Sequence, residues 1–187
     1  MFSLLGMAPN LDNTEVKILA ALQNNPRISV SELSNLVKVS RPTINKILAS
    51  MIANEKILLT SGLNAKVHQY KLANVGINVL TAKSRAEVIK ILKKCPKVLN
   101  IYRTTDQANL LLTICGGDEQ SLTSTVNCIG DLEHVDVKYS HSLGTPLKNM
   151  ALPIHIGDNS NTPCERNCYE CMSYKNEWCA GCFTFNE

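Results

Sequence analysis

Apolar positions in the first third of the chain recur at helical spacing and predict three short helices. Asp12 and Glu15 stand three residues apart, the spacing of a capping box, and Pro26 follows the end of this first helix. Ser29 and Glu32 repeat the spacing ahead of a second helix. The apolar residues expected to face inward across the three helices are Val16, Ile18, Leu19, Leu22, Leu33, Leu36, Val37, Ile44, Leu48, Met51 and Ile52.

The third helix carries the first candidate functional surface. Ser40 can cap it, and Pro42 lies in its first turn, where proline is tolerated. A tight turn before a helix with a polar leading face is typical of a helix-turn-helix. Arg and Asn suit guanine and adenine edges, and Lys suits phosphate, so the motif predicts binding to double-stranded DNA. The polar leading face consists of Arg41, Thr43, Asn45 and Lys46.

Two short apolar runs after the third helix predict a β-hairpin wing. The expected strands are Ile57–Thr60 and Val67–Leu72, joined around residues 62–66 with Lys66 near the tip. Residues 1–72 would then form a winged helix-turn-helix domain. A plain three-helix core with a solvated polar face is one alternative to DNA binding. A helix-turn-helix that contacts another protein is a second alternative.

The middle of the chain, residues 73–147, alternates short strands with helices. The expected elements are a strand at Asn74–Val79, a helix opened by a Ser84–Glu87 capping box, strands at Val98–Thr104 and Asn109–Cys115, a helix capped by Asp118, and a strand at Glu133–His141. This order is the ferredoxin-like βαββαβ pattern. The chain as a whole is predicted to be of the α+β class.

Two helices can cover only one face of such a sheet, and the other face also needs cover. We expect a second copy of the chain to supply it, which predicts a homodimer or a higher even oligomer. Val75, Ile77 and the strand around Leu110–Leu112 are the expected contributors to this contact.

Composition and charge place the positive end of the molecule in the first third. The 187 residues are 44% hydrophobic and 19% charged, as in ordinary water-soluble proteins, and no apolar run is long enough to span a membrane. Residues 1–72 hold 8 Lys and Arg against 4 Asp and Glu, a net of +4, and residues 73–187 hold 11 against 12, a net of −1. An anionic partner is therefore expected at the N-terminal domain.

The last part of the chain, residues 148–187, predicts a linker followed by a metal site. Its five cysteines follow the pattern C-x3-C-x2-C-x7-C-x2-C, and they are Cys164, Cys168, Cys171, Cys179 and Cys182. Two C-x2-C pairs can place four thiolates around one zinc ion, which makes the last four cysteines the simplest ligand set and Cys164 a fifth thiol. Four cysteines also hold iron–sulfur clusters, but the spacing differs from the ferredoxin runs, so this cofactor ranks below zinc.

The tail has two possible roles that the sequence leaves open. A static zinc site would only stabilise it, whereas a sensor would change DNA binding with metal occupancy or thiol oxidation. The other three cysteines, Cys95, Cys115 and Cys128, lie in apolar stretches and are expected to be buried reduced thiols. Reduced thiols and thiolate ligands favour a cytoplasmic protein.

Three segments together resemble the Lrp/AsnC family of prokaryotic transcription regulators. They are Leu11–Leu22, Arg27–Leu33 and Val39–Ile44, which are similar to the opening helix, the "RIS…EL" segment and the start of the recognition helix of that family. The resemblance covers residues 10–150 and implies a DNA-binding regulator, not an enzyme, with the four polar residues from Arg41 to Lys46 facing DNA. Cysteine-rich extensions occur on some archaeal regulators, which favours an archaeal source.

The second domain of this family, the RAM domain, forms dimers and larger rings and binds amino acids between subunits. The resemblance therefore implies an effector site at the turn between the second and third sheet strands, where Asp106 and Asn109 are the candidate residues. The matching stretch here, residues 105–109, keeps only Asp106 of the family's Gly-Asp-Tyr-Asp-like turn, so amino-acid sensing stays open.

Two other functional classes compete with a regulator. One is a partner-binding module with a purely structural zinc site. The other is a haem-pathway decarboxylase of the same two-domain shape, which needs histidines and arginines around a tetrapyrrole. The chain has 4 histidines and 5% aromatic residues, which disfavours the enzyme.

Overall fold

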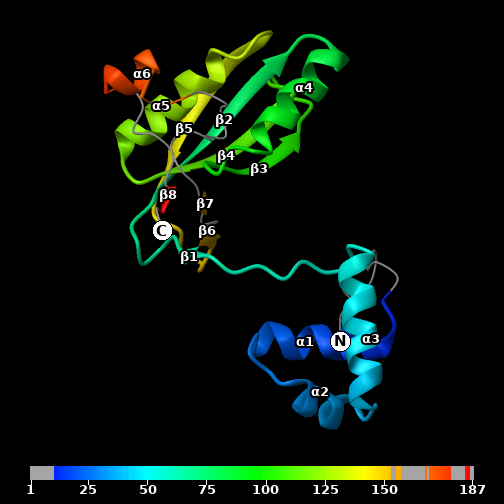
Figure 1. The fold of residues 1–187 in the computed structure, drawn as a ribbon. Helices are drawn as coiled ribbons and strands as arrows, with labels where there is room; N and C mark the ends of the chain where they lie inside the picture. Colours follow the sequence, from blue (N-terminus) through cyan, green and yellow to red (C-terminus); the bar gives the residue numbers. More distant parts are fainter. Residues whose placement is uncertain (1–10, 153–154, 157–166, 168, 178–183, 186–187) are drawn as a thin grey trace. The chain divides into compact units, whose positions relative to one another are not determined.

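The computed structural model describes residues 11–152, 155–156, 167, 169–177 and 184–185 (Figure 1). The chain divides into two compact units, Met1–Thr60 and Ser61–Glu187. Residues 61–72, which the sequence analysis assigned to the first domain, therefore belong to the second unit. Each unit is described by itself.

The first unit contains the three predicted helices. They are α1 (Asn13–Asn24), α2 (Val30–Val37) and α3 (Arg41–Ala53). Both capping boxes are formed: the Asp12 carboxylate accepts the backbone N–H of Glu15, and the Glu15 side chain accepts that of Asp12. Ser29 and Glu32 make the same reciprocal pair at α2. These local signals fix where each helix begins.

The core of the first unit is narrower than the apolar pattern predicted. Ile18, Leu33 and Ile44 are buried together at its centre. Val16, Leu36 and Ile52, expected to face inward, are instead 44%, 59% and 48% exposed. Each of these short helices buries only one narrow stripe of side chains. An apolar residue next to that stripe therefore points toward solvent.

The predicted hairpin of the wing is wrong. Residues 57–62 form no strand, and the backbone N–H of Ile57 donates to the Met51 carbonyl at 3.4 Å, which keeps Ile57 buried at 9% exposure. The strand β1 (Leu63–Asn64) instead pairs with β6 (Ala151–Leu152), antiparallel, with Leu63 opposite Leu152. The strand that forms here thus lies in the predicted connection of the hairpin, and its partner is distant in the chain.

The second unit is built on the predicted βαββαβ pattern. Its elements are β2 (Lys71–Val79), α4 (Ala82–Leu92), β3 (Val98–Arg103), β4 (Leu110–Gly116), α5 (Glu119–Gly130) and β5 (Val135–Leu143). The four strands form one antiparallel sheet in the order β3-β4-β2-β5. The α+β class is confirmed. Helix α4 begins earlier than expected, because Thr81 and not Ser84 is its N-cap.

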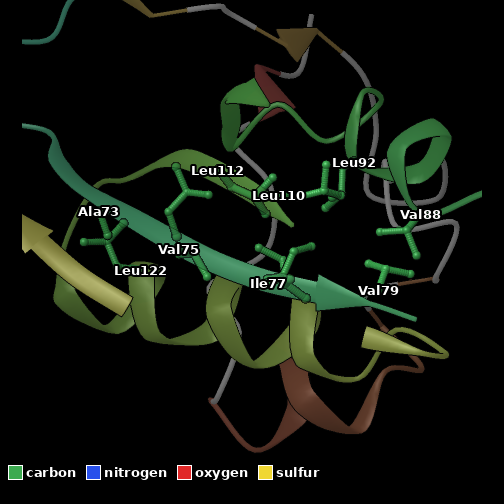
Figure 2. Close-up of a cluster of buried hydrophobic side chains, with 11 residues drawn as sticks. Ala73, Val75, Ile77, Val79, Val88, Leu92, Leu110, Leu112 and Leu122 are labelled. Carbon is green, nitrogen blue, oxygen red and sulfur yellow. The ribbon is translucent and has the colours of Figure 1, made fainter. Parts of the chain in front are cut away.

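Both helices cover the same face of this sheet. Ala73, Val75, Ile77 and Val79 alternate along β2 and point toward the helices, where they meet Val88 and Leu92 of α4, Leu122 and Ile129 of α5, and Leu110, Leu112 and Ile114 of β4 (Figure 2). Successive strand residues point to opposite sides, so this one apolar row accounts for the main core.

The open face of the sheet differs from the prediction. Val75, Ile77, Leu110 and Leu112 are fully buried within one chain, so they are not available to a second subunit. The register instead places the intervening residues on the open face: Asn74, Gly76 and Asn78 of β2, Leu111 and Thr113 of β4, Tyr102 of β3, and Tyr139 and His141 of β5. A mostly polar face is left where an apolar one was expected.

A small third cluster joins segments that the sequence analysis treated as wing and linker. Ala65, Leu72, Cys115 and Leu152 are buried together, with Met150 packed against them. The start of the expected linker therefore folds onto the second unit.

Three short elements follow. They are β7 (His155–Ile156), α6 (Met172–Lys175) and β8 (Thr184–Phe185). β7 and β8 pair in parallel, with His155 opposite Thr184. The Gln120 side chain of α5 donates to the Glu177 carbonyl just after α6. Among the described residues, no helix has the length and apolarity needed to cross a bilayer.

Candidate nucleic-acid interface

The turn between α2 and α3 sets the direction of the third helix. Lys38 ends α2 in the left-handed conformation, with φ 61° and ψ 43°. Its backbone N–H donates to the Ser34 carbonyl at 2.9 Å, and the Ser34 hydroxyl donates to the Val39 carbonyl at 2.6 Å. This left-handed residue reverses the chain within a few residues, as a helix-turn-helix requires.

The start of α3 is held by its cap. The Ser40 hydroxyl accepts the Thr43 backbone N–H at 3.3 Å, and the two hydroxyls lie 2.7 Å apart. Pro42 occupies the first turn, where its missing N–H leaves no helical bond unmade. The first turn of the candidate recognition helix is thus rigid before any ligand binds.

All four predicted DNA-facing residues are exposed. Ile44 and Met51 anchor the opposite side of α3 in the core. Arg41 and Asn45 are four residues apart, and Thr43 and Lys46 are three apart, so the exposed face carries two adjacent pairs. The Arg41 and Asn45 pair offers planar groups for base edges, whereas Lys46 offers a point charge for phosphate.

The contact that holds the end of α3 against α1 is not visible in the sequence pattern. Lys56 lies shortly after α3, and its ammonium donates to the Glu15 carboxylate at 2.8 and 3.1 Å. Glu15 is 7% exposed. Its capping-box spacing was visible in the sequence, but the partner 41 residues away was not.

Lys66 lies outside the helix-turn-helix unit. It is exposed in the turn after β1, where its backbone N–H donates to the Asn64 side chain at 3.1 Å. The predicted phosphate contact of Lys66 stays a prediction, now attached to the second unit.

The candidate effector residues have different surroundings. The Asn109 amide spans the backbone of Val79: its nitrogen donates to the Val79 carbonyl at 2.9 Å, and its oxygen accepts the Val79 N–H at 3.1 Å. Asp106 is exposed in the same turn. Asn109 thus holds the turn to the end of β2, and an effector that uses this amide would compete with those bonds.

Most of the cysteine tail lies outside the described residues. This applies to Cys164, Cys168, Cys179 and Cys182, while Cys171 directly precedes α6. Within the described part of the chain, no three metal-binding side chains gather at one place. In the sheet domain, burial and then the neighbouring Cys95 raise the pKa of the Cys115 thiol to about 11. Cys115 is therefore a neutral buried thiol at physiological pH.

Comparison with known proteins supports this geometry. A family model for winged helix-turn-helix DNA-binding domains matches residues 11–57. The crystal structure of the Mycobacterium tuberculosis leucine response regulatory protein LrpA has a TM-score of 0.66 at 15% identity, covering 76% of this chain and 100% of that one. The chain has the fold of the Lrp/AsnC regulators.

Two curated relatives are similar to this chain in sequence at low identity. The HTH-type transcriptional regulator FL11 of Pyrococcus furiosus is 22% identical over 127 residues, which is 67% of this chain and 84% of the relative. The HTH-type transcriptional regulator LysM of Saccharolobus solfataricus is 25% identical over 131 residues, which is 67% of this chain and 88% of the relative. These proteins are transcription regulators and not enzymes, in agreement with the expectation that this chain is not an enzyme.

Proposed function

We propose that this protein is a sequence-specific DNA-binding transcription regulator. The observation that carries the proposal is the exposed polar face of α3, set on a capped helix-turn-helix within the segment that matches DNA-binding domains. The similarity to archaeal and bacterial regulators supports the same conclusion. Arg41 and Asn45 would read bases, Thr43 would position the helix start, and Lys46 and Lys66 would contact phosphates.

The first test separates base reading from phosphate contact. In Arg41→Ala, the loss of a base contact should weaken operator binding by about 1–3 kcal/mol and leave binding to random duplex nearly unchanged. In Lys46→Ala, both duplexes should bind more weakly and the salt dependence should become shallower. Anisotropy titrations on a selected operator and on random DNA measure both effects.

One result would decide against this assignment. If both variants bind the operator like the wild type, the face of α3 is not the interface. Glu55→Ala is the matched control, since Glu55 is exposed just after α3 and should leave binding intact.

The partner on the open sheet face is a second part of the proposal. We infer a homodimer, or a higher even oligomer, formed through the face that carries Tyr102, Leu111 and Tyr139. The polar residues between them would make this interface less apolar than a core. Dimerisation would pair two recognition helices and so favour an operator with two half-sites.

We further propose that the cysteine tail binds one zinc ion per chain and that the loss of this zinc changes DNA binding. The backbone N–H groups of Glu170 and Cys171 both donate to the Asn167 carbonyl, at 3.1 and 3.0 Å, across the first C-x2-C stretch. The pairing of β7 with β8 brings together the two ends of the cysteine-containing segment. A tight turn and a closed segment both suit a tetrahedral thiolate site.

Zinc has no redox chemistry of its own and would hold the thiolates in place. Cys168, Cys171, Cys179 and Cys182 would be the ligands. Cys164 would be a spare thiol that can exchange with one of them.

Metal analysis of protein purified without added metal tests the tail. We expect about one zinc per chain, lost in Cys179→Ser/Cys182→Ser and largely kept in Cys164→Ser. Because structural zinc supplies about 10 kcal/mol in small peptide sites, its removal should unfold the tail and leave both other domains folded. Equal zinc loss in Cys164→Ser would show that the ligand set is different.

Apo and zinc-loaded protein should also bind the operator with different affinities. Equal affinities would rule out a sensor and leave a purely structural zinc site. A visible absorption band would instead point to an iron–sulfur cluster.

A further inference from the structure

Helix α4 and the turn after it form the positive pole of the middle domain. Residues 82–97 hold 6 Lys and Arg against 1 Glu, a net of +5. The rest of residues 73–147 holds 2 Lys and Arg against 6 Asp and Glu, a net of −4. The domain is therefore close to neutral, with a net of +1, but it is strongly polarised.

The lysines lie on the side of α4 that faces away from the sheet. Val88 and Leu92 point into the core, as their sticks show (Figure 2). Lys83 and Lys90 are two turns apart on the opposite side. The exposed lysines of this surface, which we call the α4 lysine row, are Lys83, Lys90, Lys93 and Lys94. The row is about 16 Å long at 1.5 Å of rise per residue.

Arg85 and Lys97 are the other two cations of the segment. Arg85 donates to the Val79 carbonyl at 3.2 Å, and Lys97 is only 5% exposed. Besides the lysines, α4 exposes Ala82, Ala86, Ile91 and one acid, Glu87. It has no aromatic ring and no amide that could read a base.

We propose that the α4 lysine row binds the phosphate backbone of duplex DNA that flanks the operator, without reading its sequence. The proposal rests on the DNA-binding function proposed above. Lysine is a point charge suited to phosphate, and a row of about 16 Å faces about four or five phosphates of one strand. DNA held by the recognition helices would then gain affinity with length.

The acidic groups of this domain do not offer a matching surface on a second copy. The Asp118 carboxylate already accepts the Ser121 N–H at 2.7 Å, and Asp136 pairs with Lys138. Glu133 contacts His134 at 3.3 Å. These three acids already have contacts within their own chain, which favours DNA over a second subunit as the partner of the lysines.

The experiment uses the full chain and two operator duplexes. One duplex carries only the operator, and the other carries the operator between long flanks. The variant Lys83→Gln/Lys90→Gln/Lys93→Gln removes three charges from the row. The matched control, Lys71→Gln/Lys138→Gln/Lys148→Gln, removes three exposed lysines from the same unit outside α4.

We expect the row variant to bind the short duplex like the wild type and the flanked duplex more weakly. On the flanked duplex, the slope of log affinity against log salt should become shallower by about 2–3 per chain, since each phosphate contact contributes about 0.9. The control should keep the wild-type slope on both duplexes.

Three results would overturn the proposal. Identical slopes for wild type and row variant on the flanked duplex would show that the lysines are only solvated. Equal slope changes in the control would show a non-specific charge effect. Loss of higher oligomers in the row variant without DNA would assign the row to a second copy.

If the wild type binds neither duplex, the DNA-binding function itself fails, which is a separate outcome.

Discussion

Glu15 is the residue through which the start of α1 is tied to the end of α3. One of its carboxylate oxygens accepts the Asp12 backbone N–H at 2.9 Å, and both oxygens accept the Lys56 ammonium. The hydrogen bond from Lys56, followed by the one from Asp12, lowers the pKa of Glu15 below its usual value of 4.5. One ionised side chain thus serves both a helix cap and a long-range contact.

This lowered pKa makes part of the stability of the first unit dependent on pH. The contribution is fully present above pH 4.5, the unfolded value, and is lost as pH falls through the lower folded pKa. Urea unfolding followed by helix circular dichroism should show this acid loss in the wild type and a smaller one in Glu15→Gln. Glu55→Gln is the control. If Glu15→Gln loses as much stability in acid as the wild type does, Glu15 is not the source of this pH dependence.

Among the elements, β1 depends most on one close backbone approach. A Cβ atom added to Gly62 would lie 2.1 Å from the Leu152 carbonyl oxygen and 2.8 Å from its carbonyl carbon. Both contacts are to backbone, which cannot swing aside as a side chain can. The pairing of β1 with β6 therefore requires glycine at this position.

Gly62→Ala should separate β1 from β6 and destabilise the second unit by about 1–3 kcal/mol, the usual effect of overpacking. Gly144→Ala is a matched control, because a Cβ there meets nothing within 4 Å. Hydrogen exchange of the Ala65 amide, which donates to the Met150 carbonyl at 3.0 Å, reports the local pairing. Unchanged protection in Gly62→Ala would mean that the pairing of β1 with β6 does not require glycine at position 62.

At the scale of the whole molecule, the proposed assembly uses the open face of the sheet. Tyr139 packs its ring over Gly76, where an added Cβ would lie 2.3 Å from a ring atom, and it stacks on His141 with ring centroids 5.0 Å apart. The Thr113 hydroxyl donates to the Asn74 side chain at 3.0 Å. In the proposed dimer this face would meet the same face of a second copy across a two-fold axis.

Leu111→Asp should weaken the dimer, because a carboxylate would be buried at the centre of the proposed interface. Light scattering at micromolar concentration should show a dimer or larger species for the wild type and a shift toward monomer for the variant. Leu147→Asp, at a position 95% exposed and outside this face, should stay assembled. A monomeric wild type would rule out the proposed contact.

Local signals predicted the elements better than their partners. Asp12, Ser29, Ser40 and Asp118 cap the helices that their spacing predicted, since a cap acts within one turn. Ser84 was assigned as a cap because Glu87 completes a capping-box spacing with it, but Thr81, three residues earlier, offers an equivalent hydroxyl and is the N-cap. The exposed face of α3 was also predictable, because helical periodicity separates it from Ile44 and Met51.

The sequence by itself determined the three capped helices, the βαββαβ order and the α+β class, because periodicity and caps act over a few residues. Tertiary structure alone decided which face of the sheet the helices cover, since an alternating strand does not say on which side its apolar row will be buried. It also paired Leu63 with Leu152 and Lys56 with Glu15. Those contacts join residues far apart in the chain, and no local pattern encodes them.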